Sequence, residues 1–292
     1  MNRTFEIESV GVTAVVSRIG AELRSLKGKD GSELLWQAGP EWPRHAPVLF
    51  PVVGRLTGDR LHHGGRSYPM FQHGFARDMV FDIVEENERS VALRLVDNEE
   101  TRAQYPFAFV LDIHVEAIGT TLSVRTTITN PGGTPLACGI GAHPGFAWPL
   151  VEGVPKDRHR IVFEKRESGQ ALGVEGGLLS DPCPLPFDGK SLPLSDALFA
   201  EDALVMPGIA SRSVTYQAVS ETGDVARALT VSWDGYKDLG IWSKPGGAPF
   251  VCIEPWYSMA SPEGFDADIF DKPGILVLEA GEHRSFAWSI TI

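Results

Sequence analysis

Short runs in which apolar and polar residues alternate recur along most of the chain. The runs are rich in β-branched and aromatic residues, and most are bounded by Gly, Asn, Asp or Pro. They cover residues 4–9, 12–17, 90–96, 121–130, 213–219, 228–233, 250–256 and 285–292. Alternation of period two is typical of a strand, and the bounding residues are typical of turns. The sequence therefore predicts an all-β fold, either a large sandwich or a barrel.

Turn-forming residues are frequent and helix patterns are few. The 292 residues include 31 glycines and 21 prolines, without a low-complexity tract or an internal repeat. Two stretches, 97–107 and 261–270, carry signals for short helices, and the first has an Asp or Asn cap and a proline stop. Because strands do not alternate with long amphipathic helices, a doubly wound α/β fold is disfavoured.

The expected organisation is a single domain covering residues 1–292, a length that one large all-β domain can have. The loop-rich stretch 175–194 could be a linker between two domains. The strand-like segments on its two sides are alike in composition, however. A long excursion within one sandwich explains the stretch equally well.

Charge and apolar patterning exclude several classes of partner. The chain has 26 basic and 38 acidic residues, a formal charge of −12, and no basic run that would attract nucleic acid or an anionic membrane. The N-terminal residues lack the pattern of a signal peptide, and the apolar run 46–53 is far too short to cross a bilayer. We expect a soluble protein that binds neither nucleic acid nor membrane.

Neither the cysteines nor the paired histidines predict a metal site. Cys138, Cys183 and Cys252 form no CxxC pair, which favours a reducing, cytoplasmic location. Cys138 and Cys252 lie in apolar runs, where a buried, inert thiol is expected. His62 and His63 are adjacent on a predicted strand and would point to opposite faces, so they are poor joint ligands.

Glu254 is the acidic residue in the least expected setting. It closes the apolar run FVCIEPW (250–256), and alternation places Ile253 and Glu254 on opposite faces of the strand. A carboxylate among Phe250, Trp256 and other apolar neighbours is desolvated, which raises its pKa toward neutrality and suits a general base. The alternative is a Glu that faces solvent at the end of a strand.

His143 has a comparable setting in GAHPGF (141–146). Pro144 holds the backbone of the histidine extended, so that the imidazole projects from a fixed position. An imidazole can give or take a proton at neutral pH. The alternative is a structural histidine bonded to a loop carbonyl.

A third cluster of polar residues follows FPVV (50–53). His73 lies in FQHGFARD (71–78), with Arg77 four residues later, and Arg55 lies in a glycine-containing turn. The planar guanidinium of arginine suits bidentate hydrogen bonds to hydroxyls, carboxylates or phosphates. Each arginine could equally be an ordinary surface residue.

The segments FQHGFAR, GAHPGF and CIEPW, in this order, resemble the aldose 1-epimerase (galactose mutarotase) family, and specifically its shorter LacX-like branch. The resemblance extends over essentially the whole chain. It implies a large antiparallel β-sandwich with a sugar bound in a cleft on one sheet. It also implies an isomerase that interconverts the anomers of an aldose without a cofactor.

The resemblance further implies roles for single residues. Glu254 would be the general base, His143 the general acid, and His73 a second histidine at the ring oxygen. The aspartate that holds sugar hydroxyls would be Asp202, with Asp196 as a weaker match. Arg55 matches an arginine that lines the cleft in the family, and Arg77 is a further candidate for binding substrate.

Several expectations follow for the chemistry. Glu254 is expected to be ionised and His143 protonated at neutral pH, each supporting the state of the other. A phosphate of a hexose 6-phosphate could be held by Arg55 and Arg77. The expected partner is a small-molecule sugar, and the expected assembly is a monomer or homodimer. The alternatives are a glycoside hydrolase or lyase that uses Glu254 and Asp202, and a non-catalytic carbohydrate-binding protein.

Overall fold

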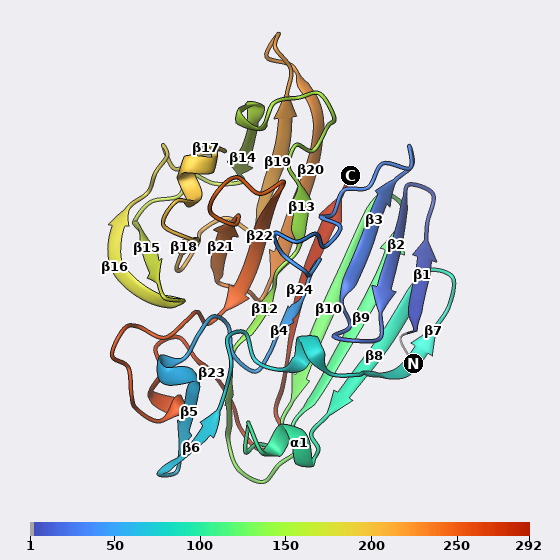
Figure 1. The fold of residues 1–292 in the computed structure, drawn as a ribbon. Helices are drawn as coiled ribbons and strands as arrows, with labels where there is room; N and C mark the ends of the chain where they lie inside the picture. Colours follow the sequence, from blue (N-terminus) through green and yellow to red (C-terminus); the bar gives the residue numbers. More distant parts are fainter. Residues whose placement is uncertain (1–2) are drawn as a thin grey trace.

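Two large antiparallel sheets form the body of the molecule in a computed structural model that describes residues 3–292 (Figure 1). Within these residues, the first sheet has nine strands. In spatial order they are β17 (Ser191–Pro193), β14 (His159–Phe163), β19 (Ser213–Val219), β20 (Val225–Asp234), β24 (His283–Thr291), β10 (Thr121–Thr129), β9 (Val110–Ile118), β8 (Ser90–Val96) and β7 (Asp82–Glu86).

The second sheet carries the residues of most interest for function. In the described part of the chain its order is β16 (Leu178–Pro184), β15 (Gln170–Glu175), β18 (Leu204–Met206), β21 (Asp238–Trp242), β22 (Phe250–Tyr257), β12 (Ile140–Ala142) and β4 (Val48–Leu49). An eighth strand, β13 (Gly145–Ala147), also pairs with β22. Strand β22 therefore has three partners, β21 on one side and β12 and then β13 on the other.

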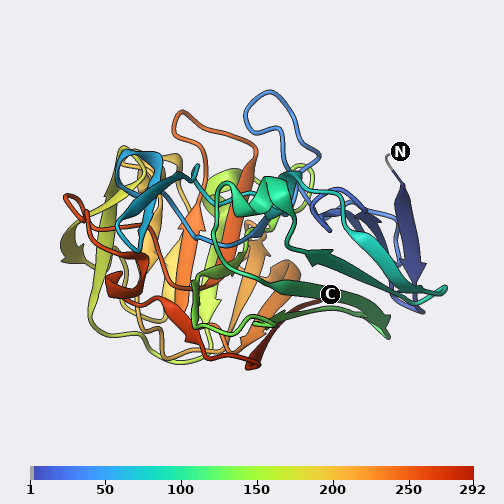
Figure 2. The same cartoon turned by 90° about the horizontal axis from the view of Figure 1, so that it is seen from below.

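Smaller elements cover the two sheets. The sheet of β1 (Thr4–Glu8), β2 (Val12–Ser17) and β3 (Leu23–Gly28) packs on β8, β9 and β10 at one end of the molecule (Figures 1 and 2). Two ribbons complete the strands, β5 (Arg60–His63) with β6 (Arg66–Pro69), and β11 (Leu136–Cys138) with β23 (Leu276–Leu278). The helical pieces are α1 (Glu99–Arg102), η1 (Thr57–Asp59), η2 (Ala76–Asp78), η3 (Lys156–Arg158), η4 (Asp196–Phe199) and η5 (Ile269–Asp271).

The alternating pattern places one set of side chains from each sheet in a common core. Leu111 and Ile113 of β9 belong to the same apolar cluster as Val251 and Ile253 of β22. Burying a side chain of this size contributes about 1.5–3 kcal/mol, so the shared core joins the two sheets. The other face of β22 is buried as well, which explains why its sequence is a continuous apolar run instead of an alternating one.

The strand predictions are confirmed, with ends that move by a few residues. The all-β, antiparallel sandwich is confirmed too. Asn98 caps α1, as the first helix signal predicts, and does so through a reciprocal capping box with Thr101, but the helix ends at Arg102 instead of running to Pro106. The second signal, in 261–270, corresponds to the short helix η5, which begins after Asp268.

The stretch 175–194 contributes to both sheets. It contains β16, at the edge of the second sheet, and β17, at the edge of the first. Among residues 3–292, the structure contains no helix with the length and apolar character needed to cross a membrane.

Candidate active site

His143 and Glu254 meet because β12 and β13 pair with β22 in one continuous register. The pairs on either side of His143 place it directly opposite Glu254, and the amide of Ile253 donates to the carbonyl of Pro144 between the two strands. Opposed residues of neighbouring strands have Cβ atoms about 4.5–5.5 Å apart. Here His143 Nε2 lies 3.1 Å from Glu254 Oε2.

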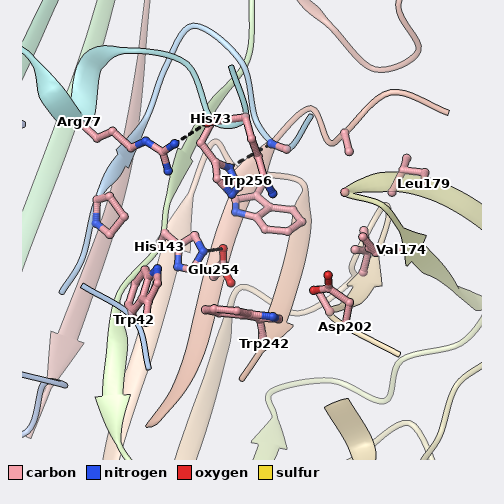
Figure 3. Close-up of a pocket in the computed structure, with 17 residues that line it drawn as sticks. Trp42, His73, Arg77, His143, Val174, Leu179, Asp202, Trp242, Glu254 and Trp256 are labelled. Carbon is pink, nitrogen blue, oxygen red and sulfur yellow. Dashed lines mark hydrogen bonds and ion pairs between the residues drawn. The ribbon is translucent and has the colours of Figure 1, made fainter. Parts of the chain in front are cut away.

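Two glycines make room for the indole of Trp256 beside this pair. Gly240 lies opposite Glu254 on β21, and a Cβ there would lie 2.3 Å from the Trp256 ring. A Cβ on Gly141 would lie 2.6 Å from the same ring. The bare backbone on both neighbouring strands lets the indole lie flat over the sheet next to the carboxyl group (Figure 3).

We expect Gly240→Ala to destabilise the protein by about 1–3 kcal/mol, the usual cost of overpacking a well-filled site. The added methyl must displace the Trp256 ring, so tryptophan fluorescence should change as well. Gly133→Ala is a suitable control because a Cβ at Gly133 meets no atom within 4 Å. Urea unfolding of the two variants makes the comparison, and equal stabilities would contradict the account of Trp256.

Three aromatic rings surround His143. The indole of Trp42 is stacked on the imidazole at 4.9 Å between centroids, and Trp242 meets it edge-on at 5.7 Å. The imidazole of His73 lies 5.5 Å away, almost perpendicular to that of His143. These contacts leave the side chain of His143 only 8% exposed and fix the plane of its ring.

His73 is held in a left-handed backbone conformation, with φ +67°. Its backbone amide donates to the carbonyl of Gly54 at 2.8 Å, and its Nδ1 accepts from the Gly54 amide at 3.1 Å. Gly74 follows with φ +69°, and a Cβ there would lie 2.3 Å from the Phe50 carbonyl oxygen. Because Nδ1 accepts a hydrogen bond, the neutral ring carries its proton on Nε2, and burial lowers the pKa of His73 well below its usual value.

A cavity of about 320 Å³ opens above these residues. His73, Arg77, His143 and Glu254 line one end of it, and Trp42, Trp242 and Trp256 supply aromatic walls (Figure 3). The other end is mostly apolar, with Val174 and Leu179 of the β15–β16 hairpin and Val205 of β18. Polar groups at one end and apolar walls elsewhere are typical of a small-molecule site.

Arg55 and Arg77, the two arginines that the sequence analysis proposed for substrate binding, lie in different places. Arg77 lines the cavity, and one of its nitrogens donates to the carbonyl of Gln72 at 2.6 Å. Burial lowers the pKa of Arg77 to about 10, although it remains charged at neutral pH. The guanidinium of Arg55 instead forms two hydrogen bonds to Asp59, at 2.7 and 2.6 Å, and a third to the carbonyl of Gly176. The structure therefore does not bring Arg55 and Arg77 together as a clamp.

Asp202 and Asp196, the two candidate aspartates, also lie in different places. Asp202 lines the cavity from the turn before β18, where burial raises the pKa of its carboxyl group and the indole of Trp242 partly offsets the rise. Asp196 begins η4 and pairs with Lys156 away from the cavity lining. Asp202 is thus the aspartate that can contact a bound molecule.

Burial acts on the two members of the pair in opposite directions. The Glu254 side chain is 1% exposed, and burial raises its pKa well above the usual range, with a further rise from the charge of Asp202. Burial lowers the pKa of His143 to about 3, with Arg77 and Arg44 adding to the effect. Burial thus opposes both charges of the expected ionised Glu254 and protonated His143. A dry environment favours a neutral carboxyl group beside a neutral imidazole.

The strand register brings a third potential metal ligand beside the pair. The ligand atoms of His143, Cys252 and Glu254 all lie within 4.8 Å of one another. The sequence analysis predicted no metal site and did not consider this grouping. Burial raises the pKa of the Cys252 thiol well above its usual value. A metal would need the thiolate, so this environment favours the protonated thiol over ligation.

The three cysteines are free thiols, and the two adjacent histidines each contact an aspartate. Cys138 and Cys252 are buried free thiols, as predicted, and Cys183 is exposed. His62 contacts Asp266 at 3.0 Å, and His63 contacts Asp268 at 3.2 Å. The two adjacent histidines thus face separate partners.

Sequence reasoning missed several residues that shape the cavity. Trp42 comes from a loop, and its isolated position between prolines in GPEWPRHAP was the only available signal. Trp242 ends the apolar strand β21 and looks like an ordinary core residue. Val174 and Leu179 come from the stretch that the sequence presents as loop-rich.

Comparison with known proteins places this geometry in a family. A sequence model described as "Aldose 1-epimerase" matches residues 3–261 of the chain. The chain belongs to the aldose 1-epimerase family. It is 32% identical to protein LacX of Lactococcus lactis subsp. lactis, in both its plasmid and chromosomal forms, with 99% of each chain covered.

Solved structures of similar proteins agree with this assignment. A galactose mutarotase related enzyme from Lactobacillus acidophilus superposes with a TM-score of 0.91 at 31% identity, covering 99% of this chain and 97% of the other. A galactose mutarotase-like protein from Lactobacillus casei superposes with a TM-score of 0.90 at 29% identity, covering 99% of both chains. The aldose 1-epimerase resemblance and the fold that it implied are confirmed.

Proposed function

We propose that this aldose 1-epimerase family member is an active mutarotase, which interconverts the α and β anomers of a sugar by opening and closing its ring. The observation that carries the proposal is the contact of 3.1 Å between His143 Nε2 and Glu254 Oε2 at the buried end of a cavity of about 320 Å³. That volume suits a monosaccharide. Ring opening requires one group to take the proton of the C1 hydroxyl and another to protonate the ring oxygen, O5.

In the proposed reaction one proton passes from Glu254 to His143, so no external acid or base is needed. A sugar hydroxyl that donates to Glu254 favours the carboxylate, because hydrogen bonds to the charged form lower its pKa. The proton then resides on His143 Nε2, next to O5. Glu254 takes the proton of the C1 hydroxyl, His143 gives its proton to O5, and the C1–O5 bond breaks to leave the open aldehyde. Rotation about C1–C2 and the reverse transfers close the ring as the other anomer.

The remaining residues would bind and orient the sugar. His73 presents a neutral Nε2–H toward the site, which suits a hydrogen bond to a sugar oxygen and not a second acid. Asp202 can accept hydrogen bonds from hydroxyls at the opposite end of the cavity. The faces of Trp42 and Trp242 can cover the apolar faces of the ring.

The hydrolase alternative would use Glu254 and Asp202 and would leave His143 without a role. The direct contact of His143 with Glu254 favours the epimerase, because the imidazole is part of the same proton-transfer unit. A pure binding protein would need neither member of the pair.

We expect Arg77 to bind the phosphate group if the sugar carries one. Arg77→Gln should then lower kcat/KM for glucose 6-phosphate about 10- to 100-fold more than for glucose, the scale of one charge-assisted hydrogen-bonded pair. Arg55→Gln is the matched control, since its guanidinium is already bonded to Asp59, and should affect both sugars equally. Equal losses for the two sugars in Arg77→Gln would contradict phosphate recognition.

The proposed function is tested by polarimetry of freshly dissolved α-glucose, α-galactose and glucose 6-phosphate with the wild-type protein. Acceleration of the approach to anomeric equilibrium on at least one sugar is the expected result. A parallel assay with p-nitrophenyl glycosides should release no nitrophenol. Nitrophenol release without faster mutarotation would support the hydrolase and contradict the epimerase.

A further inference from the structure

A buried lysine and a buried aspartate lie behind one wall of the cavity, outside the groups used in the proposed reaction. Lys272 follows η5 and is 3% exposed, and Asp238 begins β21 and is 2% exposed. The ammonium of Lys272 donates to the Ser258 hydroxyl at 3.0 Å and to the Met259 carbonyl at 2.5 Å. Buried charges of this kind are rare unless they are paired and hydrogen-bonded.

The segment that Lys272 holds forms part of the cavity wall. It leaves β22 with Ser258 in a left-handed conformation, φ +79°, and continues to Ala260, which lines the cavity. Ala260 presses against Gly54, where an added Cβ would lie 2.5 Å from the alanine methyl. The amide of Ser261 donates to the carbonyl of Arg55 at 2.9 Å, which closes the wall.

Asp238 lies beside a second wall of the cavity. Its carboxylate accepts from the amide of Gly208 at 3.0 Å, just after β18, the strand that carries Val205 into the cavity. The charge of Asp238 opposes the lowering of the Lys272 pKa by burial, and the charges of Lys237 and, more weakly, Lys272 act in return on the pKa of Asp238. Asp238 therefore holds the turn after β18 as Lys272 holds the segment after β22, and both segments border the cavity.

We propose that Lys272, with Asp238 as its counter-charge, is a positioning residue that holds the Ser258–Ser261 wall against the sugar. The proposal concerns binding at the site of the proposed mutarotase and rests on that function for its kinetic consequences. Lys272 itself touches no substrate and acts through the carbonyl of Met259. Its effect should therefore appear in KM more than in kcat.

Burial disfavours the charged form of Lys272. Burial lowers the pKa of Lys272 to about 8 from 10.5, while Asp238 opposes the change and Lys237 adds to it. Between these two pH values the unfolded chain binds more protons than the native protein, so this group makes the native state more stable as the pH rises. A charge that costs stability at neutral pH is consistent with a positioning role for its hydrogen bonds.

The test compares Lys272→Met with Lys237→Met. Lys237 is a neighbouring lysine whose ammonium donates to the carbonyl of Gly274 at 3.2 Å, so its loss matches the change in charge. We expect Lys272→Met to raise KM about tenfold at pH 7 with kcat changed less than about twofold, the scale of one lost charge-assisted hydrogen bond. In the wild type, KM should also rise above about pH 8, where Lys272 loses its proton, and this rise should be missing in Lys272→Met.

A readout that is independent of catalysis separates this inference from the proposed function. Hydrogen exchange of the Ser261 amide should be about tenfold faster in Lys272→Met than in Lys237→Met, whether or not any sugar is a substrate. An inactive wild type with this difference in exchange would overturn the function and support the positioning role. Unchanged exchange and unchanged KM in Lys272→Met would overturn the positioning role.

Asp238→Asn supplies a second variant in case Lys272→Met does not fold. Removing the counter-charge should lower the pKa of Lys272 further, because the aspartate raises it in the wild type. The alkaline rise in KM should then begin at a lower pH. A rise at the same pH as in the wild type would contradict the pairing.

Discussion

Glu254→Gln should lose about 10²–10⁴ in kcat and, at the same time, make the protein more stable. Gln cannot take the proton of the C1 hydroxyl, yet it fills the same volume. In the wild type, burial raises the pKa of Glu254, so its contribution to stability is greatest below the ordinary carboxyl pKa and is lost as the pH rises. Gln does not ionise, so Glu254→Gln does not lose stability in this way as the pH rises. Its free energy of unfolding at pH 7 should therefore exceed that of the wild type.

Glu167→Gln is the matched control for this prediction. Glu167 is also buried, but its two oxygens accept from the amides of Ala210 and Ser211 at 2.9 and 2.8 Å. Weakening these bonds should lower stability and leave kcat unchanged. Urea unfolding and the anomerisation rate are measured for both variants. A Glu254→Gln protein that is less stable than the wild type, or equally active, would contradict the account of the buried carboxyl group.

His143→Asn should lower kcat by a similar factor, because it removes the group that protonates the ring oxygen. The double variant with Glu254→Gln should be little worse than either single variant, since in the proposed reaction the two side chains act as one proton-transfer unit. Independent contributions would instead multiply. A double variant slower by the product of the two single effects would show that the residues do not form one proton-transfer unit.

His159→Gln is the control for a buried histidine with a structural role. Its ring accepts from the amide of Leu150 at 3.0 Å and contacts the carbonyl of Pro155 at 3.0 Å. This variant should lose stability without losing activity at saturating sugar. The contrast with His143→Asn is measured by initial rates and thermal unfolding on the same preparations.

The sequence predicted the strands for a physical reason. Period-two alternation is a local property, and it located β2 and β8 to the residue. FVCIEPW also showed that Glu254 must share a strand with core residues, and Ile253 does lie in the core while Glu254 faces the cavity. The contact of His143 with Glu254 depends instead on the register of strands distant in the sequence, which the motifs did not contain.

Other features depend on tertiary contacts that a single sequence does not specify. Arg55 looked like a free cation, and only the fold shows that Asp59 occupies its guanidinium. The sequence analysis expected an ionised Glu254 and a protonated His143, whereas burial favours the neutral form of each. How deeply the two side chains are buried depends on the fold. Trp42 reaches the cavity from a loop, and Lys272 reaches the segment behind the cavity wall from another, where no periodicity indicates which way a side chain points.

The central claim is that His143 and Glu254 open the sugar ring, and magnetisation-exchange NMR at anomeric equilibrium tests it most directly. The α and β C1-proton signals of the sugar that responds in polarimetry are followed with wild type, Glu254→Gln and Glu167→Gln. Exchange between the two signals with wild type and Glu167→Gln, and its loss with Glu254→Gln, is the predicted result. No exchange with folded wild type that binds the sugar, or exchange that persists in Glu254→Gln, would contradict the claim.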